Sequence, residues 1–103
     1  MIDILTVQII AALLFCIGVA VALVRRNIFF VLMGVELALN ATNLSFIGFS
    51  RTFSGSASMV GQIVPIFSIA VAAAEACVGL AMVILIFRAR ESLDSESFTS
   101  LKE

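Results

Sequence analysis

The chain has 103 residues, of which 62% are hydrophobic and 13% are charged, and its mean hydropathy is +1.22. A typical soluble domain carries about 25% charged residues, so this composition excludes an ordinary soluble domain and predicts an integral membrane protein. The net charge of −1 and the scattered basic residues form no basic patch, which argues against a nucleic-acid partner.

The apolar stretches are continuous and do not alternate between apolar and polar residues. Only helices and closed barrels cross the hydrocarbon core of a membrane, and barrel strands alternate, so the pattern predicts an all-α membrane protein. One span needs about 20 apolar residues, so the chain has room for three transmembrane helices and little else. We therefore expect a single membrane domain over residues 1–103 that serves as a subunit of a larger assembly.

The first predicted helix covers residues 4–24. Its apolar run is too long for the central region of a signal peptide, and the chain starts Met-Ile-Asp-Ile without the usual positive charges. We therefore expect a retained transmembrane helix. Gly18, Ala20 and Ala22 offer small surfaces that a neighbouring helix can approach closely.

The second predicted helix covers residues 28–49 and follows a short turn at Arg25 and Arg26, so it must run antiparallel to the first. Glu36, Asn40 and Asn43 are spaced by four and three residues, which places them on one stripe of this helix. We interpret Glu36 as a protonatable group, with the two amides placed to hydrogen-bond it or an ordered water. A structural hydrogen-bond network between helices is the alternative.

The third predicted helix covers residues 62–87. It follows a polar loop rich in serine and glycine at 50–58 and has Pro65 in its first turn, where a missing amide costs little. The remaining residues, 88–103, are expected to form a polar tail.

Glu75 lies in the middle of the third predicted helix. A charge at that depth costs at least about 2.5 kcal/mol, so a carboxylate retained there is a functional-site candidate by default. Ser68 and Gly79 share its helix face, and neighbouring alanines give another helix room to approach.

The basic residues predict how the chain is oriented in the membrane. One end of the bundle carries Arg51 alone, whereas the other carries more positive charge: Arg25, Arg26, Arg88, Arg90 and Lys102. The positive-inside rule then puts the N-terminus outside and the C-terminus in the cytoplasm. Glu36 is ten residues from Arg26, or about 15 Å of helix, and Glu75 is about 18 Å from Phe87, so both carboxylates are expected at mid-membrane depth.

Two carboxylates at similar depth on different helices suggest a lateral proton or charge relay. Burial in hydrocarbon disfavours the charged form of a carboxyl group, and none of the basic residues of this chain lies within a predicted span. Any compensating cation or water must then come from another subunit. The sequence has no histidine, and Cys16 and Cys77 lie alone in different runs, so the spacing predicts no metal site.

Nearly the whole chain resembles the K-type or 4L subunit of proton-pumping NADH:quinone oxidoreductase, respiratory complex I. The resemblance rests on a paired-arginine turn, a glutamate followed by Leu-Ala-Leu-Asn-Ala, Gly-Gln opening the third helix, and Ala-Ala-Glu-Ala followed by Val-Gly-Leu-Ala. These motifs lie in the segments LLFCIGVAVALVRRN, VLMGVELALNATNLSFIGFS and GQIVPIFSIAVAAAEACVGLAMVILIFRARES. Pro65 and the turn around SRTFSGSASMV depart from the family pattern.

The resemblance implies a non-redox subunit of a translocase in a bacterial inner membrane. It implies contacts with lipid, with antiporter-like subunits and with subunits at the quinone site, while NADH, FMN, iron-sulfur clusters and quinone bind elsewhere in the complex and no cofactor binds this chain. Glu36 and Glu75 match the two membrane glutamates that this family links to coupling, and Arg25 and Arg26 match its basic cytoplasmic turn. Asn40, Asn43 and Ser68 are expected to support the glutamates.

Three other interpretations fit parts of the pattern. A small subunit of a multisubunit cation/proton antiporter resembles the same fold, and sodium-dependent antiport without redox cofactors would identify it. A free-standing small transporter usually has four helices and an aromatic substrate site, whereas this chain has neither tryptophan nor tyrosine. A purely structural assembly subunit predicts that neither glutamate affects turnover or pumping.

Overall fold

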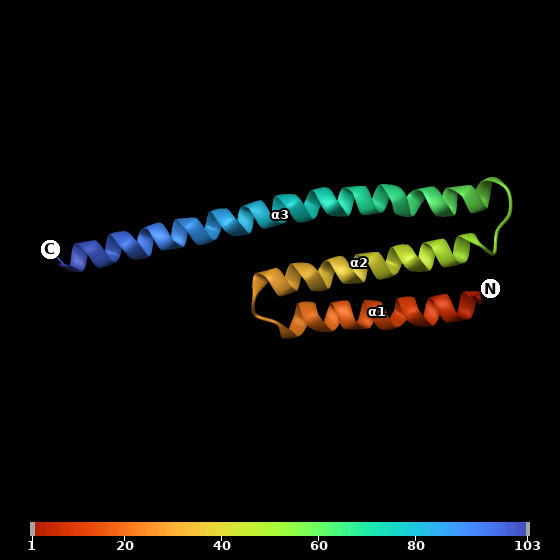
Figure 1. Cartoon of the computed structure of the whole chain (residues 1–103), viewed down its shortest axis with the longest axis horizontal. Coiled ribbons are helices and arrows are strands. Elements are labelled where there is room, and N and C mark those ends of the chain that lie inside the picture. Colours follow the sequence, from red (N-terminus) through yellow and green to blue (C-terminus); the bar gives the residue numbers. More distant parts are fainter. Residues whose placement is uncertain (1, 103) are drawn as a thin grey trace.

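The structure is a computed structural model that describes the backbone of residues 2–102 and the side chains of residues 2–96. It contains three helices: α1 (Ile4–Val24), α2 (Ile28–Ser50) and α3 (Ser56–Lys102) (Figure 1). All three are long and apolar enough to cross a membrane, and the described residues contain no strand. The prediction of an all-α protein with three transmembrane helices is confirmed.

The three helices form a flat layer with α2 in the middle. α2 packs against both of its neighbours, whereas α1 and α3 do not contact each other within the described residues. The chain measures 73 × 25 × 16 Å, and its short dimension reflects a single layer of helices (Figure 1). A single layer exposes α2 on two opposite sides, so groups on α2 can face different surroundings.

The turn between α1 and α2 is short because α2 is capped immediately after α1 ends. The side chain of Asn27 accepts a hydrogen bond of 2.9 Å from the backbone amide of Phe29, which satisfies one of the free amides at the start of a helix. The guanidinium carbon of Arg25 lies 4.3 Å from the ring centroid of Phe30, in cation–π geometry. α1 spans residues 4–24, the range expected for the first helix, and α2 ends one residue beyond the expected range.

α3 is much longer than the sequence analysis predicts. It begins at Ser56, directly after Gly55 with its left-handed φ of 64°, so the connecting loop is only residues 51–55. At the other end the helix continues to Lys102, and the expected tail at 88–102 is helical; position 103 lies outside the described residues. No glycine or proline follows Gly79, so nothing in the sequence stops the helix where the apolar run ends.

Pro65 therefore lies in the interior of α3 rather than in its first turn. A proline inside a helix lacks the amide that would bond to the carbonyl four residues earlier, here that of Gly61. The ring of Pro65 is fully buried against α2. Membrane helices accommodate such prolines when neighbouring groups compensate for the lost bond.

α1 and α2 are in backbone contact at a pair of glycines. A Cβ atom on Gly18 would lie 2.6 Å from the carbonyl oxygen of Gly34 and 2.7 Å from the amide nitrogen of Ala38. A Cβ on Gly34 would meet the carbonyl of Gly18 and the amide of Ala22 at the same two distances. Each helix thus contributes a glycine and an alanine four residues apart, the spacing that lets membrane helices approach closely.

The small surface that we expected on α1 is therefore only partly correct. Gly18 is buried and Ala22 half-buried against α2, whereas Ala20 is exposed on the other side of α1. A helix turns by about 100° per residue, so the position two residues after Gly18 cannot share its face.

Two hydrogen bonds between Gln8 and Ser45 join α1 to α2 near the start of α1. The Gln8 amide nitrogen donates to the Ser45 carbonyl oxygen at 3.1 Å, and the Ser45 hydroxyl donates to the Gln8 side-chain oxygen at 2.6 Å. Val7 and Gln8 also close over Gly48, where an added Cβ would lie 2.8 Å from a Val7 methyl carbon. Side-chain hydrogen bonds of this kind contribute about 0.6 kcal/mol each between membrane helices.

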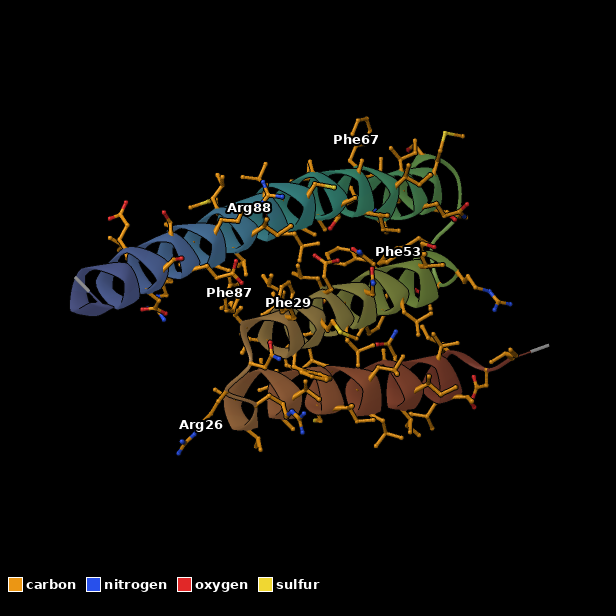
Figure 2. The ribbon with its side chains drawn as sticks, turned by 60° about the vertical axis from the view of Figure 1, so that its left-hand side comes forward. Arg26, Phe29, Phe53, Phe67, Phe87 and Arg88 are labelled. Atoms are coloured by element: carbon orange, nitrogen blue, oxygen red, sulfur yellow. The ribbon has the colours of Figure 1, made fainter. Side chains whose placement is uncertain are left out.

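α2 and α3 meet at two points near the ends of their contact. The rings of Phe29 and Phe87 stack with centroids 6.1 Å apart and planes within 3° (Figure 2). At the other end, a Cβ on Gly61 would lie 2.6 Å from the Cβ of Ser50, which is itself buried. An aromatic pair and a close glycine contact thus hold α3 against α2.

The glycines of α3 allow a matched prediction. Gly61→Ala should destabilise the α2–α3 contact by about 1–3 kcal/mol, because its methyl group would overlap Ser50. Gly79→Ala should be neutral or stabilising by up to about 1 kcal/mol, since its methyl group would meet only Leu32 Cδ2 at 3.7 Å and alanine favours helix. Thermal unfolding of the purified complex carrying each variant checks both. Equal effects of the two variants would contradict the observed packing.

Candidate functional site

The two glutamates lie level with each other across the α2–α3 contact. Gly79 contacts Leu32, and Gly61 contacts Ser50, so both ends fit one antiparallel register. Moving four residues on from Leu32 and four back from Gly79 brings Glu36 level with Glu75. The same register brings Asn43 level with Ser68.

Glu36 is half-buried and lines an open groove of about 800 Å³. Asn40, one turn further along α2, lines the same groove. The rest of the lining is apolar: Val21, Phe29, Phe30, Leu32, Met33, Gly34, Leu37, Ala76 and Leu80. Within residues 2–96 no hydrogen bond or ion pair reaches the Glu36 carboxylate, so neither Asn40 nor Asn43 bonds to it. The group that completes its environment must come from outside the described residues or from water.

A second groove of about 470 Å³ lies on the opposite side of the layer. Met33 lines the first groove and Thr42 the second. Thr42 follows Met33 by nine positions, or two and a half helical turns, so the two side chains leave α2 on opposite sides. On α3 the second groove is lined by Val60 and Val64. The layer therefore presents two different faces, with Glu36 and Asn40 opening onto one of them.

Glu75 lies on the side of α3 that belongs to the second face. It follows Val64 by eleven residues, about three full turns, so the two share a helix side. Its side chain is exposed on the surface of this chain, whereas Ala72 is buried against α2 and Ala76 lines the Glu36 groove. The two carboxylates are thus level along the helices but open toward opposite sides of the layer.

The supporting residues are placed differently from one another. Asn40 is exposed beside Glu36, and Ser68 is half-buried on the side of α3 that faces α2. Asn43 is buried, with 5% of its surface accessible, and its side-chain nitrogen has no hydrogen-bond partner among the described residues. Only Asn40 shares the groove of Glu36, so the structure divides the predicted polar stripe into an open part and a buried part.

Arg25 and Arg26 lie at the turn between α1 and α2, and both are exposed. Arg26 is ten residues from Glu36, or about 15 Å along α2. Figure 2 shows Arg26 extending away from the bundle at the turn. Neither arginine contacts Glu36 or Glu75, so the structure does not bring them into the glutamate site.

The described part of the chain holds no group of three or more histidine, cysteine or acidic side chains that could bind a metal ion. Cys16 and Cys77 are free thiols on different helices and both are exposed. The chemistry of the two faces therefore rests on their carboxylates, amides and hydroxyls.

Several residues that build the site were not identified from the sequence alone. Gly34 and Ala38 let α2 pack closely against α1, and Ser50 packs against Gly61 of α3. The spacing of Gly34 and Ala38 repeats that of Gly18 and Ala22, and this repeat is the signal that pairs the two helices.

The chain has three membrane-spanning helices and two carboxylates within them that have no partner among residues 2–96. These features define a multi-pass integral membrane protein of the multisubunit kind. Residues 6–103 match the family model of NADH-ubiquinone/plastoquinone oxidoreductase chain 4L. The chain belongs to this family, and membership makes it a membrane subunit of an NADH-quinone oxidoreductase.

Relatives with closely similar sequences agree with the family match. The chain is 51% identical over 94 residues to NAD(P)H-quinone oxidoreductase subunit 4L of Synechococcus sp. (strain JA-3-3Ab), which covers 91% of each chain. It is 46% identical over 97 residues to NADH-quinone oxidoreductase subunit K of Desulfitobacterium hafniense, covering 90% of this chain and 88% of the relative. The subunit K of Myxococcus xanthus is 49% identical over 92 residues. These matches favour the complex I subunit over the antiporter subunit.

Proposed function

We propose that Glu36 and Glu75 are two links of a relay that couples quinone reduction in partner subunits to proton translocation. The observation that supports this most is the position of Glu36, half-buried in an apolar groove and level with Glu75 on the next helix. A carboxylate at membrane depth is costly to keep, which makes it a functional-site candidate.

The two faces of the helix layer could each contact a different neighbouring subunit, which fits a subunit that links the two. Glu36 opens onto one face and Glu75 onto the other, so each carboxylate can interact with a different adjacent subunit. No basic side chain of the described residues pairs with either of them. Each charge must then be balanced by a partner cation or by water, and the relay depends on assembly.

The redox chemistry belongs to other chains in this proposal. The subunit itself is non-redox and belongs to a translocase, and quinone, NADH, FMN and iron-sulfur clusters act in the rest of the complex. Its partners are the antiporter-like subunits, the subunits at the quinone site and membrane lipid. The N-terminus faces outward and the C-terminus the cytoplasm, in a bacterial inner membrane. The bacterial and cyanobacterial relatives support that membrane.

Glu75→Gln tests the second link. The glutamine keeps the size of the side chain but holds no exchangeable charge, so we expect the complex to assemble and its proton translocation to fall at least about tenfold. The measurement is proton uptake into vesicles during NADH oxidation, with complex content determined by immunoblot. Glu91→Gln is the matched control, because Glu91 is exposed on the same helix beyond the apolar run and should pump at the wild-type rate. Full pumping by an assembled Glu75→Gln complex would refute the role of Glu75.

A further inference from the structure

Asn43 is a buried polar side chain whose hydrogen-bonding needs are not met by the described residues. Only 5% of its surface is accessible, and its side-chain nitrogen is fully buried without a hydrogen-bond partner. A buried donor left without an acceptor costs about 1–3 kcal/mol, so a native protein almost always supplies one.

The position of Asn43 restricts what that acceptor can be. Asn43 precedes Ser50 by seven residues, or about two turns, and therefore shares the side of α2 that Ser50 presses against Gly61 of α3. α1 contacts the other side of α2, at Gly34, Ala38 and Gly48. Asn43 thus lies on the side of α2 that faces α3, and little of its surface is left accessible to a neighbouring subunit.

Ser68 is the polar residue of α3 that lies level with Asn43. It is half-buried on the face toward α2, and no hydrogen bond to its hydroxyl is formed within the described residues. Most of the neighbours of Ser68 on this face of α3 are small or apolar: Gly61, Pro65, Ala72 and Ala76. An amide and a hydroxyl that lie level on the facing sides of α2 and α3, without a direct bond, provide the two polar partners that a buried water requires.

We propose that Asn43 and Ser68 bind one water molecule between α2 and α3. The amide of Asn43 donates a hydrogen bond to the water oxygen. A second hydrogen bond joins the same water to the Ser68 hydroxyl. The site lies two turns from Glu36 along α2 and two turns from Glu75 along α3, and it crosses the contact that separates the two faces of the layer. Its role in proton translocation rests on the function proposed above, whereas the site itself does not.

The direct test is a cryo-EM structure of the assembled complex at a resolution that shows ordered water. We expect a peak within hydrogen-bond distance of the Asn43 nitrogen and the Ser68 oxygen in the wild type. The peak should be absent from Asn43→Leu, which keeps the side-chain size. Thr42→Val is the matched control, since the Thr42 hydroxyl bonds the Ala38 carbonyl within its own helix, and the peak should remain there. A wild-type map without water at this position overturns the site.

The role of the site has a separate readout. Asn43→Leu should pump protons about fivefold more slowly per complex, the factor that corresponds to the loss of one hydrogen bond, while Thr42→Val pumps normally. A water peak in the wild type together with normal pumping by Asn43→Leu would overturn the role and leave the site. If the glutamate variants pumped normally, the relay would fail instead, and the water peak would still decide the site.

Discussion

Glu36→Gln is expected to remove most proton translocation from an otherwise assembled complex. The carboxylate lies half-buried among apolar side chains, where glutamine fits the same volume but cannot change its charge. Proton transfer by a positioned group is commonly worth about 10²–10⁴-fold, so the loss should reach at least about tenfold. Oxidation of NADH by a water-soluble electron acceptor should continue, because that reaction does not need the membrane relay.

Proton uptake into vesicles, set against NADH oxidation by the soluble acceptor, checks this expectation. Glu36→Asp keeps the charge on a shorter side chain and should retain part of the pumping, whereas Asp94→Asn removes an exposed charge beyond the apolar run and should retain all of it. If an assembled Glu36→Gln complex pumps at the same rate as Asp94→Asn, the charge at Glu36 is not needed and Glu36 is not a relay group.

Gly18→Leu is expected to prevent the chain from accumulating in the complex. A Cβ at this position would already lie 2.6 Å from the Gly34 carbonyl oxygen, which is a backbone atom and cannot move aside. The helices must separate, and the contacts between Gly18, Gly34, Ala22 and Ala38 are lost together. Overpacking of a tight contact typically costs about 1–3 kcal/mol, and a clash with backbone belongs at the upper end of that range.

Ala20→Leu is the matched control for this variant. Ala20 lies on the exposed side of the same helix, so the larger side chain should be accommodated in lipid or against a loosely packed neighbour. The amount of the chain in purified complex and its thermal unfolding temperature measure both variants. Normal accumulation of Gly18→Leu would show that α1 and α2 do not pack through their glycines.

The three spans and their order could be predicted because the membrane sets the length of an apolar helix. The flat layer could not. The membrane-spanning parts of the helices are apolar around most of their circumference, so no clear amphipathic pattern indicates which side faces protein and which faces lipid. Gly18 gave a partial signal, and only the matching spacing of Gly34 and Ala38 identifies the partner helix.

The length of α3 was predicted poorly for a related reason. The change from apolar to charged residues at Arg88 marks where the hydrocarbon ends and not where the helix ends. Pro65 by itself indicates a nearby helix start, but a proline inside a membrane helix is tolerated when neighbours compensate. Helix ends depend on local capping and on glycine or proline, and the sequence after Gly79 has neither of these residues.

In the candidate site, the cost of a buried charge identifies the functional residues, whereas helix packing decides where they lie. Glu36 and Glu75 were found because a carboxylate in a span is too costly to keep without a use. Their placement on opposite sides of the layer depends on the rotation of each helix about its axis, which follows from contacts such as Ser50 with Gly61. The burial of Asn43 depends on the same contacts, so the predicted stripe could not be divided from spacing alone.

If Glu36 and Glu75 act in one relay, a double-variant cycle will show it. The ratio of protons translocated to electrons transferred should be measured for Glu36→Gln, Glu75→Gln and the double variant in assembled complexes. Two links in series predict that each single variant loses most of the ratio and that the double variant loses no more than the worse single one. A double variant with losses that multiply would show two independent paths, and a wild-type ratio in all three would show that neither glutamate takes part.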